Sequence, residues 1–136
     1  MHGKRVRMKK VGSFTATMIC TLLLGEVSGW AQNQAEGRKL YASYCSTCHG
    51  EKGKGDGMAA KSLPAKPADH TNGAIMNQMS DKFLVDVIAK GGSAVGKSSF
   101  MPSWGSALDE KQVRDLVAFI RTLAVPTYKG DTPASK

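Results

Sequence analysis

Cys45, Cys48 and His49 stand in the pattern Cys-x-x-Cys-His. Two thiols three positions apart can reach the two vinyl groups on one side of a porphyrin and form thioethers with them. The residue after the second cysteine then lies under the ring, where an imidazole nitrogen can bind iron. This spacing predicts one covalently attached haem c, with His49 as an axial ligand of the iron.

Three other uses of the cysteine pair stay open at this point. A thioredoxin-like redox pair needs a strand–helix–strand context, and no such pattern precedes Cys45. A structural zinc site needs four ligands, but after residue 31 the sequence adds only His70 to Cys45, Cys48 and His49 as a cysteine or histidine ligand. A plain disulfide between the two cysteines would leave His49 without a role.

A second axial ligand must come from elsewhere in the chain. The candidates after residue 31 are His70, Met58, Met76, Met79 and Met101. Met101 is favoured because Pro102 removes a backbone donor and stiffens the loop that presents the thioether. The other methionines suit packing, which is the usual use of this residue. His70 follows Asp69 in a polar loop, and we expect it to face solvent.

Three amphipathic patterns predict helices that position these residues. Their ranges are Ala35 to Cys45, Asp81 to Lys90 and Asp109 to Ala124. The last is the clearest, since its apolar residues follow the i, i+3, i+4, i+7 spacing of one helical face. No stretch alternates as a β-strand should, so the sequence predicts an all-α domain with long loops. Loops of that length need a purpose in a small domain, and enclosing a haem is one.

Residues that favour helix ends stand at the borders of the second and third patterns. Ser80 can cap the second helix, and Gly91 can end it. Asp109 and Gln112 have the spacing of a capping box at the start of the third helix, and Pro126 follows its end. The helix borders are therefore predicted to lie close to these residues.

The first 31 residues have the pattern of a secretory signal peptide. Basic residues fill its start, an apolar run follows, and Gly29-Trp30-Ala31 offers a cleavage site after Ala31. An uncut membrane anchor is the alternative, although the apolar run is short for a bilayer. Cleavage would lower the formal net charge from +8 to +4, because the leader holds more basic than acidic residues. We predict a domain from 32 to 127, a polar flexible tail from 128 to 136, and a periplasmic location.

These motifs resemble the class I, monohaem branch of the cytochrome c family, in its small bacterial form. The resemblance runs from Gly37 to Leu123. It rests on Gly37-x-x-Leu40-Tyr41-x-x-x-Cys45-x-x-Cys48-His49-Gly50, Gly55-Asp56-Gly57, the Pro64–Pro67 loop, Met101-Pro102-x-Trp104 and Leu116-Val117-Ala118-Phe119-Ile120-Arg121. It implies three main helices around one haem, with Gly37 letting the first helix approach Phe119 on the last. It also implies a backbone carbonyl near Pro64 that accepts a hydrogen bond from the His49 ring.

The resemblance further implies an electron carrier rather than an enzyme, with a closed His49/Met101 iron site and a redox protein as partner. Lysines that would face an acidic partner are Lys52, Lys54, Lys61 and Lys97. A monomer is expected, with neither nucleic acid nor nucleotide as ligand and no membrane span after cleavage. Two other functions stay open: a haem enzyme or gas-binding protein with a displaceable sixth ligand, and a subunit of a larger periplasmic oxidoreductase.

One further motif, from Gly91 to Ser98, matches the phosphate-binding pattern G-x-x-x-x-G-K-[ST] letter for letter. That mechanism needs a strand before the loop and a helix after it. A helical pattern precedes this segment and Phe100-Met101-Pro102 follows it. We therefore expect the glycines to turn the chain from the second helix toward the Met101 loop.

Overall fold

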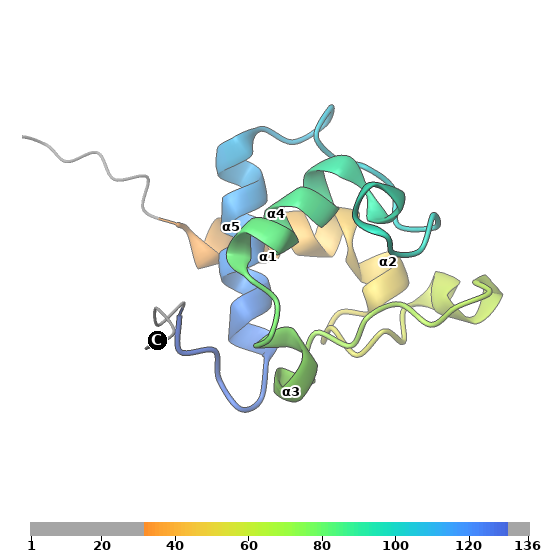
Figure 1. The fold of residues 1–136 in the computed structure, drawn as a ribbon, viewed down its shortest axis with the longest axis horizontal. Helices are drawn as coiled ribbons and strands as arrows, with labels where there is room; N and C mark the ends of the chain where they lie inside the picture. Colours follow the sequence, from red (N-terminus) through yellow and green to blue (C-terminus); the bar gives the residue numbers. More distant parts are fainter. Residues whose placement is uncertain (1–31, 131–136) are drawn as a thin grey trace, which may run out of the picture.

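Helices make up almost all the regular structure in residues 32–130, which are the residues that the computed structural model describes (Figure 1). In chain order they are α1 (Gln34–Tyr44), α2 (Ser46–His49), α3 (Gly73–Met76), α4 (Asp81–Lys90) and α5 (Glu110–Leu123), with 3-10 turns at Met58–Ser62 and Gly92–Val95. One isolated β-bridge joins Asn72 to Val125. The predicted all-α class is confirmed. The predicted leader and the last six residues lie outside the described part.

Helices α1 and α5 cross in close contact at Gly37 (Figure 1). A Cβ atom at this position would lie 1.9 Å from the backbone oxygen of Asp115 and 3.0 Å from the Cβ atom of Phe119. Only glycine lets the two backbones approach so closely. The backbone N–H of Asn33 also donates to the carboxylate of the buried Asp115 at 2.7 Å, which ties the start of α1 to α5. The expected crossing at Gly37 is confirmed.

The borders of α4 and α5 follow the capping residues. The Ser80 hydroxyl accepts from the backbone N–H of Phe83 at 3.1 Å, and Gly91 ends α4 with a φ of 84°. At α5 the Asp109 carboxylate accepts from the Gln112 N–H, and the Gln112 side chain accepts from the Asp109 N–H. These two bonds form the predicted capping box. Helix α5 ends at Leu123, one residue before the predicted border.

The apolar face of α5 forms the centre of the core. Its residues Val113, Leu116, Val117 and Ile120 are almost fully buried, together with apolar side chains of α1 and α4. Burying each such side chain stabilises the fold by about 1.5–3 kcal/mol. The core therefore holds α1, α4 and α5 together, while the longer connections run around one side of them.

The cysteine motif is positioned by a short helix, which the apolar periodicity of the sequence did not predict. Cys45 ends α1 and at the same time precedes α2, so the chain turns at this residue and continues as a second helix. Helix α2 carries Cys48 and His49 on a single turn. Four residues are too few for an apolar period to be visible, which explains why the sequence pattern showed only α1.

Candidate haem-binding site

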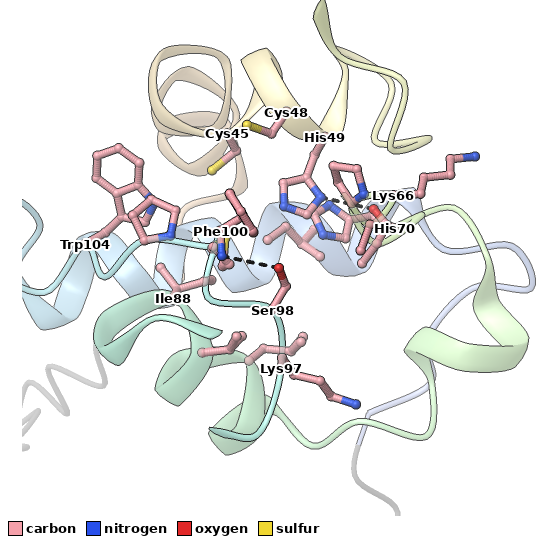
Figure 2. Close-up of a pocket in the computed structure, with 18 of the residues that line it drawn as sticks. Cys45, Cys48, His49, Lys66, His70, Ile88, Lys97, Ser98, Phe100 and Trp104 are labelled. Carbon is pink, nitrogen blue, oxygen red and sulfur yellow. Dashed lines mark hydrogen bonds between the residues drawn. The ribbon is translucent and has the colours of Figure 1, made fainter. Parts of the chain in front are cut away.

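Cys45, Cys48, His49 and Met101 all line one cavity of about 330 Å³ (Figure 2). Its remaining walls are mostly apolar and come from the loop after α2, from α3 and α4 and the segment between them, from the loop before α5 and from α5 itself. The apolar lining includes Leu63, Met76, Met79, Phe83, Leu84, Val87, Ile88, Pro102, Trp104 and Ile120. The volume and the apolar character are typical of cofactor pockets with a few placed polar groups.

The two cysteines are free thiols at the wall formed by the end of α1 and by α2. Cys45 is buried and Cys48 is half-buried. Burial, and to a lesser extent the neighbouring Cys48, raises the pKa of the Cys45 thiol to about 12. Both thiols line the cavity, so they are available to a group inside it.

The zinc alternative finds no support in the described part of the chain. Within residues 32–130, no cluster of three or more histidine, cysteine, aspartate or glutamate side chains could hold a metal ion. The disulfide alternative is absent as well, because Cys45 and Cys48 are both unpaired. The cysteine pair therefore needs another use.

The His49 ring is held by a backbone carbonyl of the loop that follows α2. Its Nδ1 atom lies 3.0 Å from the carbonyl oxygen of Ala68. A carbonyl can only accept, so Nδ1 donates and Nε2 keeps the free lone pair of a neutral ring. Burial lowers the pKa of His49, which favours this neutral form. The expected carbonyl near Pro64 is thus that of Ala68.

Gly55 brings the loop after α2 against the segment that supplies this carbonyl. A Cβ atom at Gly55 would lie 2.3 Å from the backbone oxygen of Pro67, and its φ is 68°. Its N–H also donates to the His49 carbonyl at 2.8 Å. The glycine therefore positions Ala68, one residue beyond Pro67, beside the His49 ring.

The Met101 loop is attached to the end of α4 by backbone hydrogen bonds. The Gly92 N–H donates to the Met101 carbonyl at 2.9 Å, and the Trp104 N–H donates to the Ile88 carbonyl at 2.9 Å. Met101 is half-buried and lines the cavity. Gly91 to Ser98 follows helix α4 rather than a strand and contains the 3-10 turn Gly92–Val95. This is the predicted turn toward Met101, and it lacks the strand–loop–helix geometry of a phosphate loop.

The other methionines differ in their position relative to the cavity. Met76 is buried in the core and Met79 packs against it, and both line the cavity. Arg121 holds this wall in place, because its guanidinium donates to the carbonyls of Met76 and Met79 and pairs with Asp81. Met58 is 88% exposed and does not line the cavity.

The prediction that His70 faces solvent is wrong. The side chain is 8% exposed, and its Nδ1 atom lies 3.1 Å from the hydroxyl of Tyr41. Its ring stacks on His49 with centroids 4.3 Å apart and planes inclined by 18° (Figure 2). Asp69 does stay at the surface side, where it accepts from Thr71. The polar neighbour Asp69 had suggested an exposed position for His70. The signal that this prediction missed was Tyr41 on α1, because a buried phenol needs a hydrogen-bond partner.

Two lysines stand at the cavity. Lys66 and Lys97 line it, and their ammonium groups point away from its interior (Figure 2). The other lysines expected near the site do not line it, although they are exposed: Lys52, Lys54 and Lys61. Of the lysines named from the sequence, only Lys97 is thus part of the wall, and Lys66 was missed.

Comparison with known proteins agrees with this geometry. Residues 32–120 match the family of cytochrome c oxidase, cbb3-type, subunit III. The chain belongs to this cytochrome c family. It is also similar to the cbb3-type cytochrome c oxidase subunit FixP of Azorhizobium caulinodans, with 29% identity over 102 residues. That match covers 74% of this chain and 31% of FixP, so the chain spans less than a third of that relative.

Two solved structures have a similar fold. The KustC0563 c-type cytochrome gives a TM-score of 0.54 with 25% identity, covering 65% of this chain and 96% of that chain. A chain of the Kuenenia stuttgartiensis reducing HAO-like protein complex Kustc0457/Kustc0458 gives 0.52 with 26% identity, covering 65% and 41%. With the family match, these neighbours identify a class I-like c-type cytochrome, an electron carrier that uses haem c.

Proposed function

We propose that this chain carries a single haem c in the cavity and works as a one-electron relay. Cys45 and Cys48 would hold the haem through thioethers, and His49 Nε2 and the Met101 thioether would be its axial ligands. The observation that carries this proposal is that all four side chains line one apolar cavity. They come from two chain segments about fifty residues apart in the sequence.

The donor set suits a haem. Two unpaired thiols three positions apart match the porphyrin vinyl groups, and a neutral imidazole with a free lone pair follows directly. When bound, the haem supplies the reversible one-electron chemistry of its iron. A thioether is a soft ligand, and His/Met ligation raises the reduction potential.

The protein's part is to position these donors and to exclude water. Ala68 fixes the tautomer of His49, and such a carbonyl partner is the usual support of a metal-binding histidine. His70 is a poor candidate for the opposite ligand, because its ring stacks on His49 and so lies on the same side. Met101 comes from a separate loop, which supports its assignment as the second ligand.

Covalent attachment is the direct test of this function. The chain is expressed with a c-type haem maturation system and then denatured, once as the natural sequence and once as Cys45→Ser/Cys48→Ser. We expect haem to stay on the natural chain after denaturation and to be lost from the double variant. Haem that extracts freely from both chains would refute the proposed attachment.

We propose that the leader directs the chain to the periplasm and is cut after Ala31. Within residues 32–130, no helix is long and apolar enough to cross a membrane. Mass spectrometry of the haem protein from the native cell distinguishes the two outcomes. A chain that begins at Gln32 supports cleavage, whereas a chain that keeps the leader supports the membrane-anchor alternative.

The relatives favour a second candidate, in which the chain serves as a subunit of a larger oxidoreductase complex. FixP is a subunit of a cbb3-type oxidase, and one structural neighbour comes from a protein complex. The relay chemistry is the same in both roles. Native electrophoresis with a haem stain distinguishes the two roles. A free carrier migrates at the size of one chain, whereas a subunit migrates in the larger band that shows the activity of the complex.

A further inference from the structure

A row of three aromatic rings extends from Tyr41 on α1 through His70 to the proposed iron ligand His49, and the first two are buried. Tyr41 on α1 is 1% exposed, and its hydroxyl lies 3.1 Å from His70 Nδ1. The His70 ring stacks on the His49 ring at 4.3 Å (Figure 2). Tyr41 also contacts Phe119 of α5 edge to face, with ring centroids 5.2 Å apart. The row therefore connects the α1–α5 crossing to His49.

The Tyr41–His70 hydrogen bond orients the His70 ring, because it joins the Tyr41 hydroxyl to Nδ1 of that ring. Burial raises the pKa of the Tyr41 phenol, so this side chain keeps its proton. Both side chains are almost fully buried, where a polar group needs a hydrogen-bond partner. A phenol O–H that donates to Nδ1 leaves the proton of a neutral His70 ring on Nε2. The bond thus restricts the rotation of the His70 ring.

His49 needs two constraints to hold its plane. The bond to Ala68 holds one edge of the ring, but a single hydrogen bond still lets the plane tilt. The face-on contact with His70 removes this freedom. Both constraints come from residues 68–70, and this segment is itself attached to the loop after α2, because the His70 N–H donates to the Gly53 carbonyl.

We propose that Tyr41 and His70 are positioning residues that set the plane of the His49 ring relative to the haem, with the hydrogen bond between them as the orienting contact. This inference rests on the proposed function, since it assumes that His49 binds iron. The competing explanation is that His70 only fills space between α1 and the cavity. The two explanations differ in what happens when the hydrogen bond is removed and both rings are kept.

The experiment uses the haem-loaded, oxidised protein and ¹H NMR. In a low-spin ferric haem, the spread of the four ring-methyl shifts depends on the orientation of the axial imidazole plane. The variants are Tyr41→Phe, His70→Phe and the double variant. Each of them removes the Tyr41–His70 hydrogen bond and keeps an aromatic ring at both positions. Asp109→Ala is the matched control, because it removes the capping box of α5 and costs stability without touching the cavity.

We expect both single variants to change the ring-methyl pattern, and the double variant to match a single one, because all three lose the same bond. Asp109→Ala should unfold more easily and yet keep the natural pattern. A natural pattern in Tyr41→Phe would overturn the proposal. Should His70→Phe fail to fold, Tyr41→Phe still decides, since it removes one oxygen atom.

Failure of the proposed function gives a different result. If His49 does not bind the iron, the low-spin ring-methyl signals are missing from the natural chain and from Asp109→Ala as well. If the inference alone fails, those signals are present and Tyr41→Phe leaves them unchanged. The reduction potential provides a second measurement, since a reoriented ligand shifts it and a lost space-filling contact elsewhere does not.

Discussion

Burial favours the neutral forms of Cys45, His49 and His70 at the cavity. It raises the pKa of Cys45 and lowers those of His49 and His70. An apolar wall disfavours charge, so an acid holds its proton and an imidazole does not gain one. His49 and the Met101 thioether would thus present neutral donors to the iron.

Asp86 on α4 shows the opposite behaviour, and it predicts a stability change at low pH. Lys82 and Lys90 lie 2.6 Å from its carboxylate and lower its pKa from 3.8 to about 2. A carboxyl whose pKa is lower in the folded state stabilises the fold above its ordinary pKa and loses this contribution as the pH falls from about 4 to 2. Asp86→Asn should therefore be less stable than the natural chain at pH 7, with a difference that shrinks toward pH 2.

Urea unfolding of both chains at pH 7, 4 and 2.5 measures this difference. Taking the difference removes the contribution of all other carboxyl groups, which the two chains share. Because the pairs are at the surface, high salt should reduce the difference at pH 7 too. A difference that stays constant over the whole pH range would contradict the prediction.

At the level of single residues, the sequence was informative where function depends on local spacing. Cys45, Cys48 and His49 lie within five residues, so their relation is visible without a fold. His70 was placed wrongly because its surroundings are set by Tyr41, which lies 29 residues earlier. A contact over such a distance leaves no periodic pattern in the chain.

At the level of the elements, caps and apolar periodicity predicted α4 and α5 closely. Both helices have a side-chain cap that satisfies backbone donors, and the sequence shows such caps directly. Helices α2 and α3 each have four residues, and the 3-10 turns are similarly short. Their conformations depend on tertiary contacts, so the sequence pattern did not predict them.

Gly37 allows a test of the helix crossing. Replacing a helical glycine by alanine normally favours the helix by roughly 1 kcal/mol. Here the added methyl would overlap the Asp115 carbonyl oxygen, at 1.9 Å. We expect Gly37→Ala to destabilise the fold by about 1–3 kcal/mol, the usual cost of overpacking a core contact.

Thermal unfolding of the haem-loaded Gly37→Ala protein measures this effect. Ser43→Ala, on an exposed position of the same helix, is the control for changed helix propensity. An unchanged or raised melting temperature in Gly37→Ala would show that α1 and α5 do not approach each other as closely as described.

At the level of the whole molecule, the cavity is assembled from segments that are far apart in sequence. Its lining runs from Tyr44 to Ile120 and draws on the loop after α2, on α4 and on the loop before α5. Sequence patterns identified some donors but not the complete wall. A domain of about 100 residues has a small core, and a haem in this cavity would add apolar contacts to it.

The charge around the cavity predicts how small oxidants react with the reduced protein. Lys66 and Lys97 line the cavity, and their positive charge would attract an anion to this side of it. We expect Lys66→Glu/Lys97→Glu to slow oxidation by ferricyanide and to speed oxidation by a cationic cobalt(III) complex. Added salt should reduce both changes, because it screens surface charge.

Stopped-flow kinetics with the two oxidants checks this prediction. Lys52→Glu/Lys61→Glu is the matched control, since it makes the same change in net charge at exposed lysines that do not line the cavity. Equal rate changes in the two double variants would show that only net charge matters and that the electron does not leave through the edge beside Lys66 and Lys97.

The visible spectrum of the oxidised and the reduced haem protein, natural and Met101→Ala, tests the proposed iron site most directly. We predict sharp low-spin bands on reduction and a far-red thioether-to-iron band on oxidation. This band should vanish in Met101→Ala, with a lowered reduction potential, and persist in Met58→Ala, whose side chain is outside the cavity. A Met101→Ala spectrum identical to that of the natural chain would contradict the His49/Met101 assignment.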